Sequence, residues 1–233
     1  MANEIEQKAD IGRLFDRIAR RYDRFNHLLS MGIDKGWRRR AVNGMQHHQN
    51  VLDVAVGTGD LALELLGRNK ADKVTGIDLS EEMMRVAEHK ARRKGLGERL
   101  GLMKANAQAM PFEDASFDAV TCGFGIRNFQ HLNQGLQEMY RVLKPGGELL
   151  ILEFAYPNNR LVRGFYNLYF VHLMPIIGRM LVGDKKPFLY FRESVRGFMW
   201  GDKLVERLRA AGFKDATYQQ LSCSIAMIYK AIK

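Results

Sequence analysis

Short apolar runs alternate with amphipathic segments from about residue 50 onward. A bounded apolar run predicts a buried strand, whereas apolar residues that recur every three or four positions predict a helix. Strands that alternate with helices in this way favour right-handed crossovers and a largely parallel sheet with helices on both faces. The predicted strands are 51–56, 73–78, 99–105, 117–123 and 148–154, and the predicted helices are 60–68, a helix capped by Ser80 that runs to about 94, and one around 136–143.

The two ends of the chain complete this pattern. The first fifty residues have helical periodicity, residues 201–213 predict a further helix, and the stretch from there to Lys233 predicts two strands close enough for a hairpin. The sequence therefore predicts an α/β fold: a doubly wound, mostly parallel, seven-stranded Rossmann-like sheet with a C-terminal antiparallel hairpin and N-terminal helices. The apolar face of the N-terminal region consists of Ile11, Leu14, Phe15, Ile18 and Tyr22.

Segment 158–198 does not follow the alternation, because it is aromatic and basic together. Its apolar stretch, 165–182, includes Asn167, Pro175 and Arg179, which disfavour a transmembrane helix. We expect a helical lid or an interfacial element here instead.

Charge is distributed unevenly along the chain. The net charge is +10, of which segment 17–40 contributes +6 and segment 160–197 contributes +5, so the remainder carries −1. Such an excess favours an anionic surface, either nucleic acid or a membrane leaflet.

Two distant cysteines without metal-ligand spacing disfavour disulfides and a metal site. A polar N-terminus without a signal or transit peptide predicts a cytoplasmic location.

A glycine-rich turn follows the first predicted strand. Gly57 and Gly59 lie in this turn, and Asp78 ends the next strand, 19 residues beyond Gly59. Glycines let a ligand approach the backbone where a helix begins, and an acid at the end of the second strand can accept hydrogen bonds from a ribose. This spacing predicts a nucleoside site. Because Gly57-x-Gly59-x-x-Ala62 also fits a loose dinucleotide fingerprint, an NAD-dependent oxidoreductase stays open.

Acidic residues beside the turn favour a cationic ligand. Asp60 at the helix start would repel a pyrophosphate, whereas Asp53 and Asp60 would attract the ammonium and sulfonium of S-adenosylmethionine (SAM). The alternative is that Asp53, Asp60 and Asp78 are ordinary strand-end or helix-start acids.

Longer motifs carry a more specific resemblance. The chain resembles the class I methyltransferases and, within them, the ubiquinone/menaquinone biosynthesis C-methyltransferases. The stretch Gly123-Phe124-Gly125-Ile126-Arg127-Asn128 and the N-terminal RIARRYD pattern are the most specific parts. The resemblance covers residues 15–40, 51–62, 76–84, 105–129 and 139–154.

The resemblance implies that SAM is the methyl donor. Thr58 and the glycines would line the methionine moiety, Asp78 would bind the ribose, and Asn106 with Ala107 would lie against the adenine. The complete expected donor site is Asp53, Gly57, Thr58, Gly59, Asp78, Asn106, Ala107 and Gly123.

The resemblance also implies C-methylation of a prenylated quinol. The short length favours demethylmenaquinol as acceptor, and a polyprenyl benzoquinol or another small molecule stays open. A ring hydroxyl must ionise before its carbon attacks, so we expect a cation that lowers the pKa of the phenol. Arg127 is the candidate for this role, with a structural ion pair as the alternative. Tyr22 is a candidate for orienting the ring, with core packing as the alternative, and His131 is a weaker candidate base.

A long isoprenoid tail would explain the remaining features. Segment 165–182 could cover the tail, while the basic segments would hold the enzyme on the inner, anionic face of the cell membrane. The aromatic residues accompany aliphatic ones, which disfavours RNA as a partner.

A nucleoside-binding scaffold without activity is a further alternative, and the oligomeric state is not indicated. The expected single domain, 1–233, divides into an arm (1–48), a donor-binding core (49–156), a lid (157–198) and a C-terminal helix and hairpin (199–233).

Overall fold

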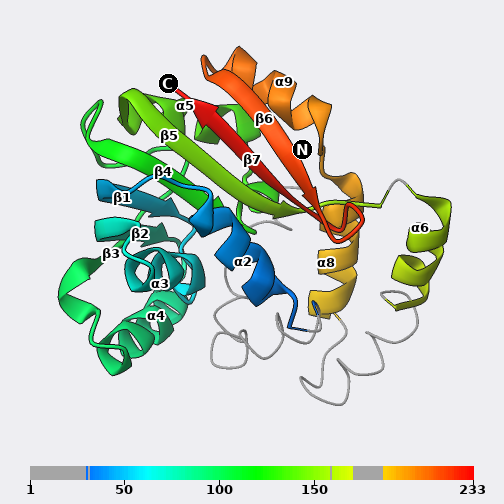
Figure 1. Cartoon of the computed structure of the whole chain (residues 1–233), viewed down its shortest axis with the longest axis horizontal. Helices are drawn as coiled ribbons and strands as arrows, with labels where there is room; N and C mark the ends of the chain where they lie inside the picture. The colour runs from blue at the N-terminus through cyan, green and yellow to red at the C-terminus, as the bar shows by residue number, and fades with distance from the viewer. Residues whose placement is uncertain (1–29, 31, 158, 170–185) are drawn as a thin grey trace.

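A seven-stranded sheet with strand order β3-β2-β1-β4-β5-β7-β6 forms the centre of the molecule (Figure 1). The computed structural model describes residues 30, 32–157, 159–169 and 186–233. All strand pairs are parallel except β5 with β7 and β6 with β7. The predicted fold class and hairpin are therefore confirmed. The strands are β1 (His48–Val54), β2 (Ala71–Asp78), β3 (Leu100–Lys104), β4 (Phe117–Gly123), β5 (Leu143–Phe154), β6 (Lys214–Leu221) and β7 (Ala226–Ile232).

Helices pack against both faces of this sheet, because its central strands have apolar side chains on both sides. Leu150 and Leu152 of β5 join the core beneath α2 and α3, whereas Leu149 and Ile151 join the core beneath α5 and α9. The described helices are α2 (Asp34–Asn43), α3 (Asp60–Gly67), α4 (Glu81–Arg93), α5 (Leu132–Val142), α6 (Arg160–Asn167), α8 (Lys186–Gly197) and α9 (Asp202–Ala210), with the 3-10 turns η1 (Gly97–Arg99) and η2 (Ile126–Asn128).

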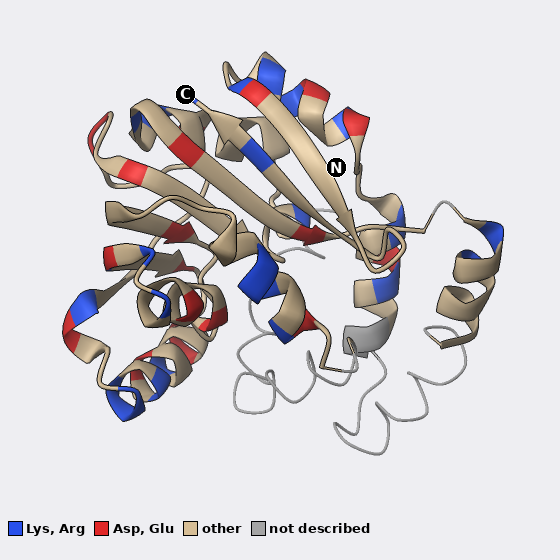
Figure 2. Ribbon diagram, in the orientation of Figure 1, with Lys and Arg blue, Asp and Glu red and all other residues tan. Residues whose placement is uncertain are grey.

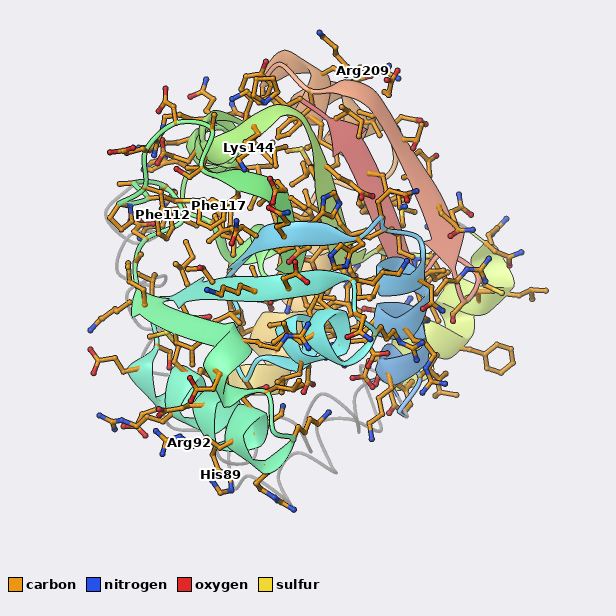
Figure 3. All side chains as sticks on the ribbon, turned by 60° about the vertical axis from the view of Figure 1, so that its left-hand side comes forward. His89, Arg92, Phe112, Phe117, Lys144 and Arg209 are labelled. Carbon is orange, nitrogen blue, oxygen red and sulfur yellow. The ribbon has the colours of Figure 1, made fainter. Side chains whose placement is uncertain are left out.

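Helix α4 begins where the sequence predicts. The Ser80 hydroxyl accepts a hydrogen bond from the Met83 amide at 3.2 Å, which satisfies one of the open donors of the first turn. Ala87 is buried against the rest of the protein. His89 and Arg92 lie on the outer side of the helix and point away from the sheet (Figure 3). His89 is therefore a surface residue remote from the sheet.

Strand β5 is longer than predicted. It begins at Leu143, directly after α5, and passes through Pro145-Gly146-Gly147, the gap between the predicted helix around 136–143 and the predicted strand 148–154. The pairing with β4 shifts register near Phe117, as in a β-bulge. Gly147 is required there, because a Cβ would lie 2.8 Å from the Asp118 carbonyl oxygen.

Two predicted segments are described only in part. The amphipathic face from Ile11 to Tyr22 lies outside the described residues, and α2 is the described portion of the N-terminal arm. Of the lid, α6 and α8 are described and 170–185 are not. Within the described ranges, no helix is both long and apolar enough to cross a membrane.

Candidate active site

The glycine-rich turn lies at the carboxyl end of β1, where α3 begins. Gly57 and Gly59 have φ angles of 54° and 79°, a region that favours glycine. A Cβ on Gly59 would also lie 2.9 Å from the Cβ of Ala87 in α4. Thr58, between the two glycines, is buried. The turn is thus fixed both by its backbone conformation and by close contact with α4.

Asp78 holds this turn against the end of β2. One carboxylate oxygen accepts a hydrogen bond from the Gly57 amide at 2.8 Å, and the other accepts one from the Ser80 amide at 2.9 Å. A carboxylate has about four acceptor positions, so the same group can also accept bonds from hydroxyls. The predicted acid therefore lies directly beside the predicted glycine loop.

Asp53 lies beneath the turn and is 1% exposed. Its Oδ1 accepts a hydrogen bond from the Thr121 hydroxyl at 2.7 Å, whereas its buried Oδ2 has no partner with hydrogen-bond geometry. Burial raises the pKa of the Asp53 carboxyl from 3.8 to about 7, and the Thr121 hydroxyl and the Ala62 amide oppose this rise. A positive charge nearby would favour the ionised form.

Asp60 has cationic partners that the sequence argument did not include. Its carboxylate forms an ion pair with Lys90 of α4, and the Arg38 guanidinium of α2 lies 3.4 Å away. These cations offset the negative charge that was expected to exclude a pyrophosphate, so Asp60 by itself does not separate SAM from NAD.

Arg38 also differs from expectation. It belongs to the basic segment that was predicted to face a membrane, but only 7% of it is exposed. It pairs with Asp34 as well as Asp60, and its guanidinium lies 5.4 Å from the ring centroid of Phe124. Arg38 therefore links α2 to the glycine-rich turn and has no part in a surface charge. Arg39 and Arg40 are exposed, as the prediction requires.

The segment after β3 lies next to Asp78. The Ala105 amide donates to the Asp78 carbonyl at 3.1 Å, and the side chain of Asn106 accepts from the Gln108 amide at 3.0 Å. Asn106 is exposed and Ala107 is half-buried, so both border solvent at this edge.

Gln108, which the sequence analysis missed, is buried and accepts a hydrogen bond from the His131 amide. His131 itself is exposed, which fits a surface residue better than a buried base.

The end of β4 packs closely against the same turn. A Cβ on Gly123 would lie 3.1 Å from the Leu61 side chain of α3, and one on Gly125 would lie 2.6 Å from the Cβ of Ala55. These glycines bring the carboxyl ends of β1 and β4 together. The ends of four adjacent strands, β3, β2, β1 and β4, thus carry the expected donor-site residues Asp53, Gly57, Thr58, Gly59, Asp78, Asn106, Ala107 and Gly123.

Arg127 forms a buried ion pair with Glu153. Its Nη1 lies 2.7 Å from Glu153 Oε1, and the two side chains are 4% and 1% exposed. Glu153 also accepts from the Arg127 amide at 3.3 Å and from the Phe154 amide at 2.8 Å. The structural ion pair that was the alternative for Arg127 is therefore present, and it leaves the predicted catalytic role untested. Glu153 is a site residue that the analysis missed, although an acid within the apolar run 148–154 is a signal that could have indicated it.

Aromatic rings surround this ion pair. The Arg127 guanidinium lies 5.5 Å from the ring centroid of Phe154 and 5.4 Å from that of Phe191, and both distances allow cation-π contact. Phe154 in turn packs against Phe124, with ring centroids 4.4 Å apart, and against Trp37 at 5.8 Å. Four buried rings and two arginines thus form one cluster beside the glycine-rich turn.

Helix α8 is attached to this cluster at a second point. The Tyr190 hydroxyl donates to Asn128 Oδ1 at 2.7 Å, next in sequence to Arg127. Part of the predicted lid therefore contacts the predicted catalytic region. Tyr22, the second catalytic candidate, lies outside the described residues. Within the described part of the chain, no cluster of three or more His, Cys, Asp or Glu residues could hold a metal.

The fold and the site define a class of protein: a Rossmann-like domain with a nucleoside site at the carboxyl ends of its parallel strands. A model of the ubiE/COQ5 methyltransferase family matches residues 1–233. The chain belongs to this family and is a methyltransferase, which confirms the resemblance.

Individual relatives cover nearly the whole chain. A demethylmenaquinone methyltransferase of Porphyromonas gingivalis is 41% identical, over 99% of this chain and 95% of the relative. The ubiquinone/menaquinone biosynthesis C-methyltransferase UbiE of Geotalea daltonii is also 41% identical, over 98% of each chain. Among solved structures, a SAM-dependent methyltransferase of Thermotoga maritima, described as a possible histamine N-methyltransferase, has a TM-score of 0.67 at 22% identity and covers 95% of this chain and 99% of that chain. The last comparison supports the fold alone.

Proposed function

We propose that this protein transfers a methyl group from SAM to a ring carbon of demethylmenaquinol, giving menaquinol. The observation that carries the proposal is the adjacency of two sites at one edge of the sheet. The glycine-rich turn with Asp78 suits a nucleoside, and the buried cluster around Arg127 suits an aromatic ring that must ionise. The names of the relatives from Porphyromonas and Geotalea support the same acceptor class.

The donor assignment is supported by the partnerless oxygen of Asp53. When bound, SAM would supply an electrophilic methyl group on a positively charged sulfur, together with a charged amino group. Asp53 would match this charge, because a nearby cation restores the ionised state that burial disfavours. Asp78 would accept hydrogen bonds from the ribose, while Thr58, Gly57, Gly59 and Gly123 would bring backbone to the ligand. Asn106 and Ala107 would border the adenine.

Arg127 would act on the acceptor. A phenol has a pKa of about 10, and a fixed guanidinium in apolar surroundings lowers that pKa and stabilises the phenolate. Glu153 would hold the guanidinium in place, and the rings of Phe124, Phe154 and Phe191 would exclude water. Methyl transfer then depends mainly on aligning the ring carbon with the methyl group. Tyr22 stays a candidate for orienting the ring.

The acceptor could also belong to the ubiquinone series, because the Geotalea relative carries both quinones in its name. Supplying labelled SAM with a demethylmenaquinol and with a polyprenyl benzoquinol distinguishes the two. We expect label on the ring carbon of the naphthoquinol product. Label only on the benzoquinol would reassign the acceptor, and label on neither would refute quinol methylation.

Arg127→Gln separates an enzyme from a nucleoside-binding scaffold. We expect calorimetric SAM affinity to stay within about twofold of wild type while quinol turnover falls at least 100-fold, the scale of one lost electrostatic donor. Arg127→Lys, which keeps the charge without the planar geometry, should recover part of the rate. Full turnover in both variants would exclude a catalytic role for Arg127.

We further propose that the enzyme works on the cytoplasmic side of the cell membrane, at an anionic leaflet. Exposed basic residues of α2, namely Lys35, Arg39 and Arg40, support this location. Each well-placed cation contributes about 1 kcal/mol near such a surface. The partner is therefore a lipid surface and a prenylated quinol, and no nucleic acid is involved.

A further inference from the structure

Helix α6 exposes a continuous apolar face. Leu161, Phe165 and Leu168 are 77%, 74% and 59% exposed. They follow one another at intervals of four and three residues, so they lie on one side of the helix. The helix has its own N-terminal cap, because Asn159 Oδ1 accepts from the Leu161 amide at 2.9 Å and from the Val162 amide at 3.3 Å. Three large apolar side chains in solvent are unusual on so short an element.

The opposite face of α6 is packed against the protein. Tyr166 is 4% exposed, and its ring meets that of Tyr156 edge to face at a centroid distance of 5.5 Å. The Tyr156 hydroxyl donates to Asn167 at 3.0 Å. The guanidinium of Arg196, from α8, lies 5.6 Å from the same Tyr156 ring. Helix α6 is thus attached through one face, which leaves the apolar face directed outward.

The surroundings of this face are basic. Arg160 is exposed at the start of α6, whereas Arg163 lies over Tyr156 on the packed side of the helix. Figure 2 shows basic positions and no acidic ones on this helix. The sequence has no aspartate or glutamate at all from 154 to 183. An apolar face with a cation beside it and no acid nearby in the sequence matches the chemistry of an anionic bilayer surface.

Helix α6 also borders the proposed acceptor site. The Tyr166 phenol lies close enough to Arg127 for the guanidinium charge to favour its ionisation, although burial dominates and raises the pKa of Tyr166. Helix α8 carries Phe191 over Arg127, and its Arg196 meets the same Tyr156 ring as Tyr166 of α6; Figure 1 shows α6 further out from the sheet than α8. One face of α6 therefore points toward the acceptor site and the other points away from the molecule.

We propose that α6 is the element that enters the membrane surface. Leu161, Phe165 and Leu168 insert at the boundary between headgroups and acyl chains of an anionic leaflet, and the exposed Arg160 contacts the headgroups. The proposal deepens the proposed function, because it brings the Arg127 region to the leaflet that dissolves the isoprenoid tail. The occupant of the face is lipid rather than a second copy of the chain, since Arg160 beside it would approach the equivalent arginine of the second copy in a twofold contact, with no acid nearby in the sequence to pair with it.

Vesicle binding tests this assignment. The variant Leu161→Gln/Phe165→Gln/Leu168→Gln is compared with Met103→Gln, which removes a 42% exposed apolar side chain on β3, far from α6 in the sheet order. Co-sedimentation uses vesicles of phosphatidylcholine with phosphatidylglycerol, and vesicles of phosphatidylcholine alone. We expect at least a tenfold loss of affinity for anionic vesicles in the triple variant and none in Met103→Gln. Unchanged binding of the triple variant would overturn the proposal.

A second variant tests insertion of the apolar face directly, rather than through a loss of vesicle binding. Phe165→Trp places an indole on the exposed face, and its emission should shift to the blue when anionic vesicles are added. An emission spectrum that stays constant while the protein sediments would show that another element inserts. Light scattering measures the oligomeric state of both proteins. If the wild type is a dimer and the triple variant is a monomer, the face binds a second copy, and the lipid assignment is overturned.

Activity assays separate this inference from the proposed function. With a quinol that carries one isoprene unit in detergent-free buffer, the triple variant should turn over at the wild-type rate. With a long-tailed quinol in vesicles its rate should fall at least tenfold. If wild-type protein methylates neither quinol but its tryptophan variant still shifts on vesicles, the proposed function fails and the membrane assignment stands. Equal losses with both quinols would contradict a role in membrane contact.

Discussion

At the scale of a single residue, we expect Asp53 to make donor binding depend on pH. The pKa of its carboxyl is 3.8 in an ordinary environment and about 7 in the folded protein. As pH rises from about 4 to 7, the unfolded chain loses this proton before the folded protein does. Its contribution therefore lowers the stability of the fold across this window and levels off above pH 7.

Asp53→Asn should stabilise the protein and weaken donor binding. Removing a buried ionised group should raise the free energy of unfolding at pH 8 by about 1–2 kcal/mol, measured by urea denaturation. Calorimetry should show SAM affinity about tenfold lower at pH 8 and much less affected at pH 6, where wild-type Asp53 is largely protonated. The variant Thr121→Val lacks a hydrogen bond that favours the ionised form of Asp53. The midpoint of the pH dependence of SAM affinity should therefore lie at higher pH in this variant than in the wild type. A wild-type affinity that is constant from pH 6 to 8 would contradict this account.

Glu153 is expected to act on turnover by positioning Arg127. Glu153→Gln leaves the guanidinium buried without its countercharge, a change that costs about 3–5 kcal/mol in stability for a fully buried pair. In protein that circular dichroism shows to be folded, we expect kcat to fall at least tenfold while SAM affinity stays unchanged. Glu153→Asp should recover part of kcat. A matching loss of SAM affinity would instead indicate general disruption of this end of the sheet.

Spacing along the chain predicted Gly57, Gly59 and Asp78 as neighbours, because a turn and the next strand end are local features of one βαβ unit. It could not predict the partners of charged residues. Asp60 meets Lys90 and Arg38, and Arg127 meets Glu153, across separations of more than 20 residues. Counting charges by segment therefore placed Arg38 on a surface when it lies in the interior.

At the scale of elements, α3 depends on a glycine that satisfies two demands. Gly59 combines a positive φ with the close approach of Ala87 from α4. Gly59→Ala should lower the free energy of unfolding by about 2–3 kcal/mol, of which left-handed backbone accounts for about 1–2 kcal/mol. It should also weaken SAM binding, because the turn must move.

A matched control lies at the other end of the same helix. Gly67 has no atom within 4 Å of an added Cβ, so Gly67→Ala should be neutral or slightly stabilising. Urea denaturation of both variants with SAM calorimetry checks the pair. If Gly59→Ala stays within about 0.5 kcal/mol of wild type, the turn is less constrained than its geometry indicates.

Element prediction succeeded where apolar periodicity was clear and failed at glycine. Every predicted strand is present, and the central strands β1, β4 and β5 leave the clearest apolar runs because they are buried. The start of β5 was misplaced because Gly146-Gly147 indicates a stop in most contexts, whereas here it forms an irregularity inside a paired strand. Whether the two glycines end the strand or form an irregularity inside it depends on the pairing with the neighbouring strand. That strand is distant in sequence, so a local pattern does not reveal the pairing.

At the scale of the whole molecule, the proposed donor site lies where the sheet order reverses. Strand β1 has β2 on one side and β4 on the other, so the loops that follow these strands diverge and leave room for a ligand. Ligand bound there stabilises the entire domain by mass action, by about 2.7 kcal/mol at a concentration 100 times the Kd.

Thermal unfolding should therefore report the donor class. For a chain of 233 residues, that stabilisation corresponds to a rise in Tm of about 5–10 °C with SAM. NAD at the same concentration should leave Tm unchanged. Because Asp60 is paired with two cations, this comparison of Tm values distinguishes SAM from NAD better than the charge of the glycine-rich turn does. An equal rise with NAD would point to a dinucleotide site.

The strand order also constrains how the chain is made. Strand β7 lies between β5 and β6, yet it is the last of the seven in sequence. During synthesis the hydrogen-bonding edge of β5 must stay open until residues 226–232 have left the ribosome, and β6 has no place in the sheet before then. An open edge on a long apolar strand invites wrong pairing. Newly made protein should accordingly need chaperone protection late in translation, after most of the domain has already emerged.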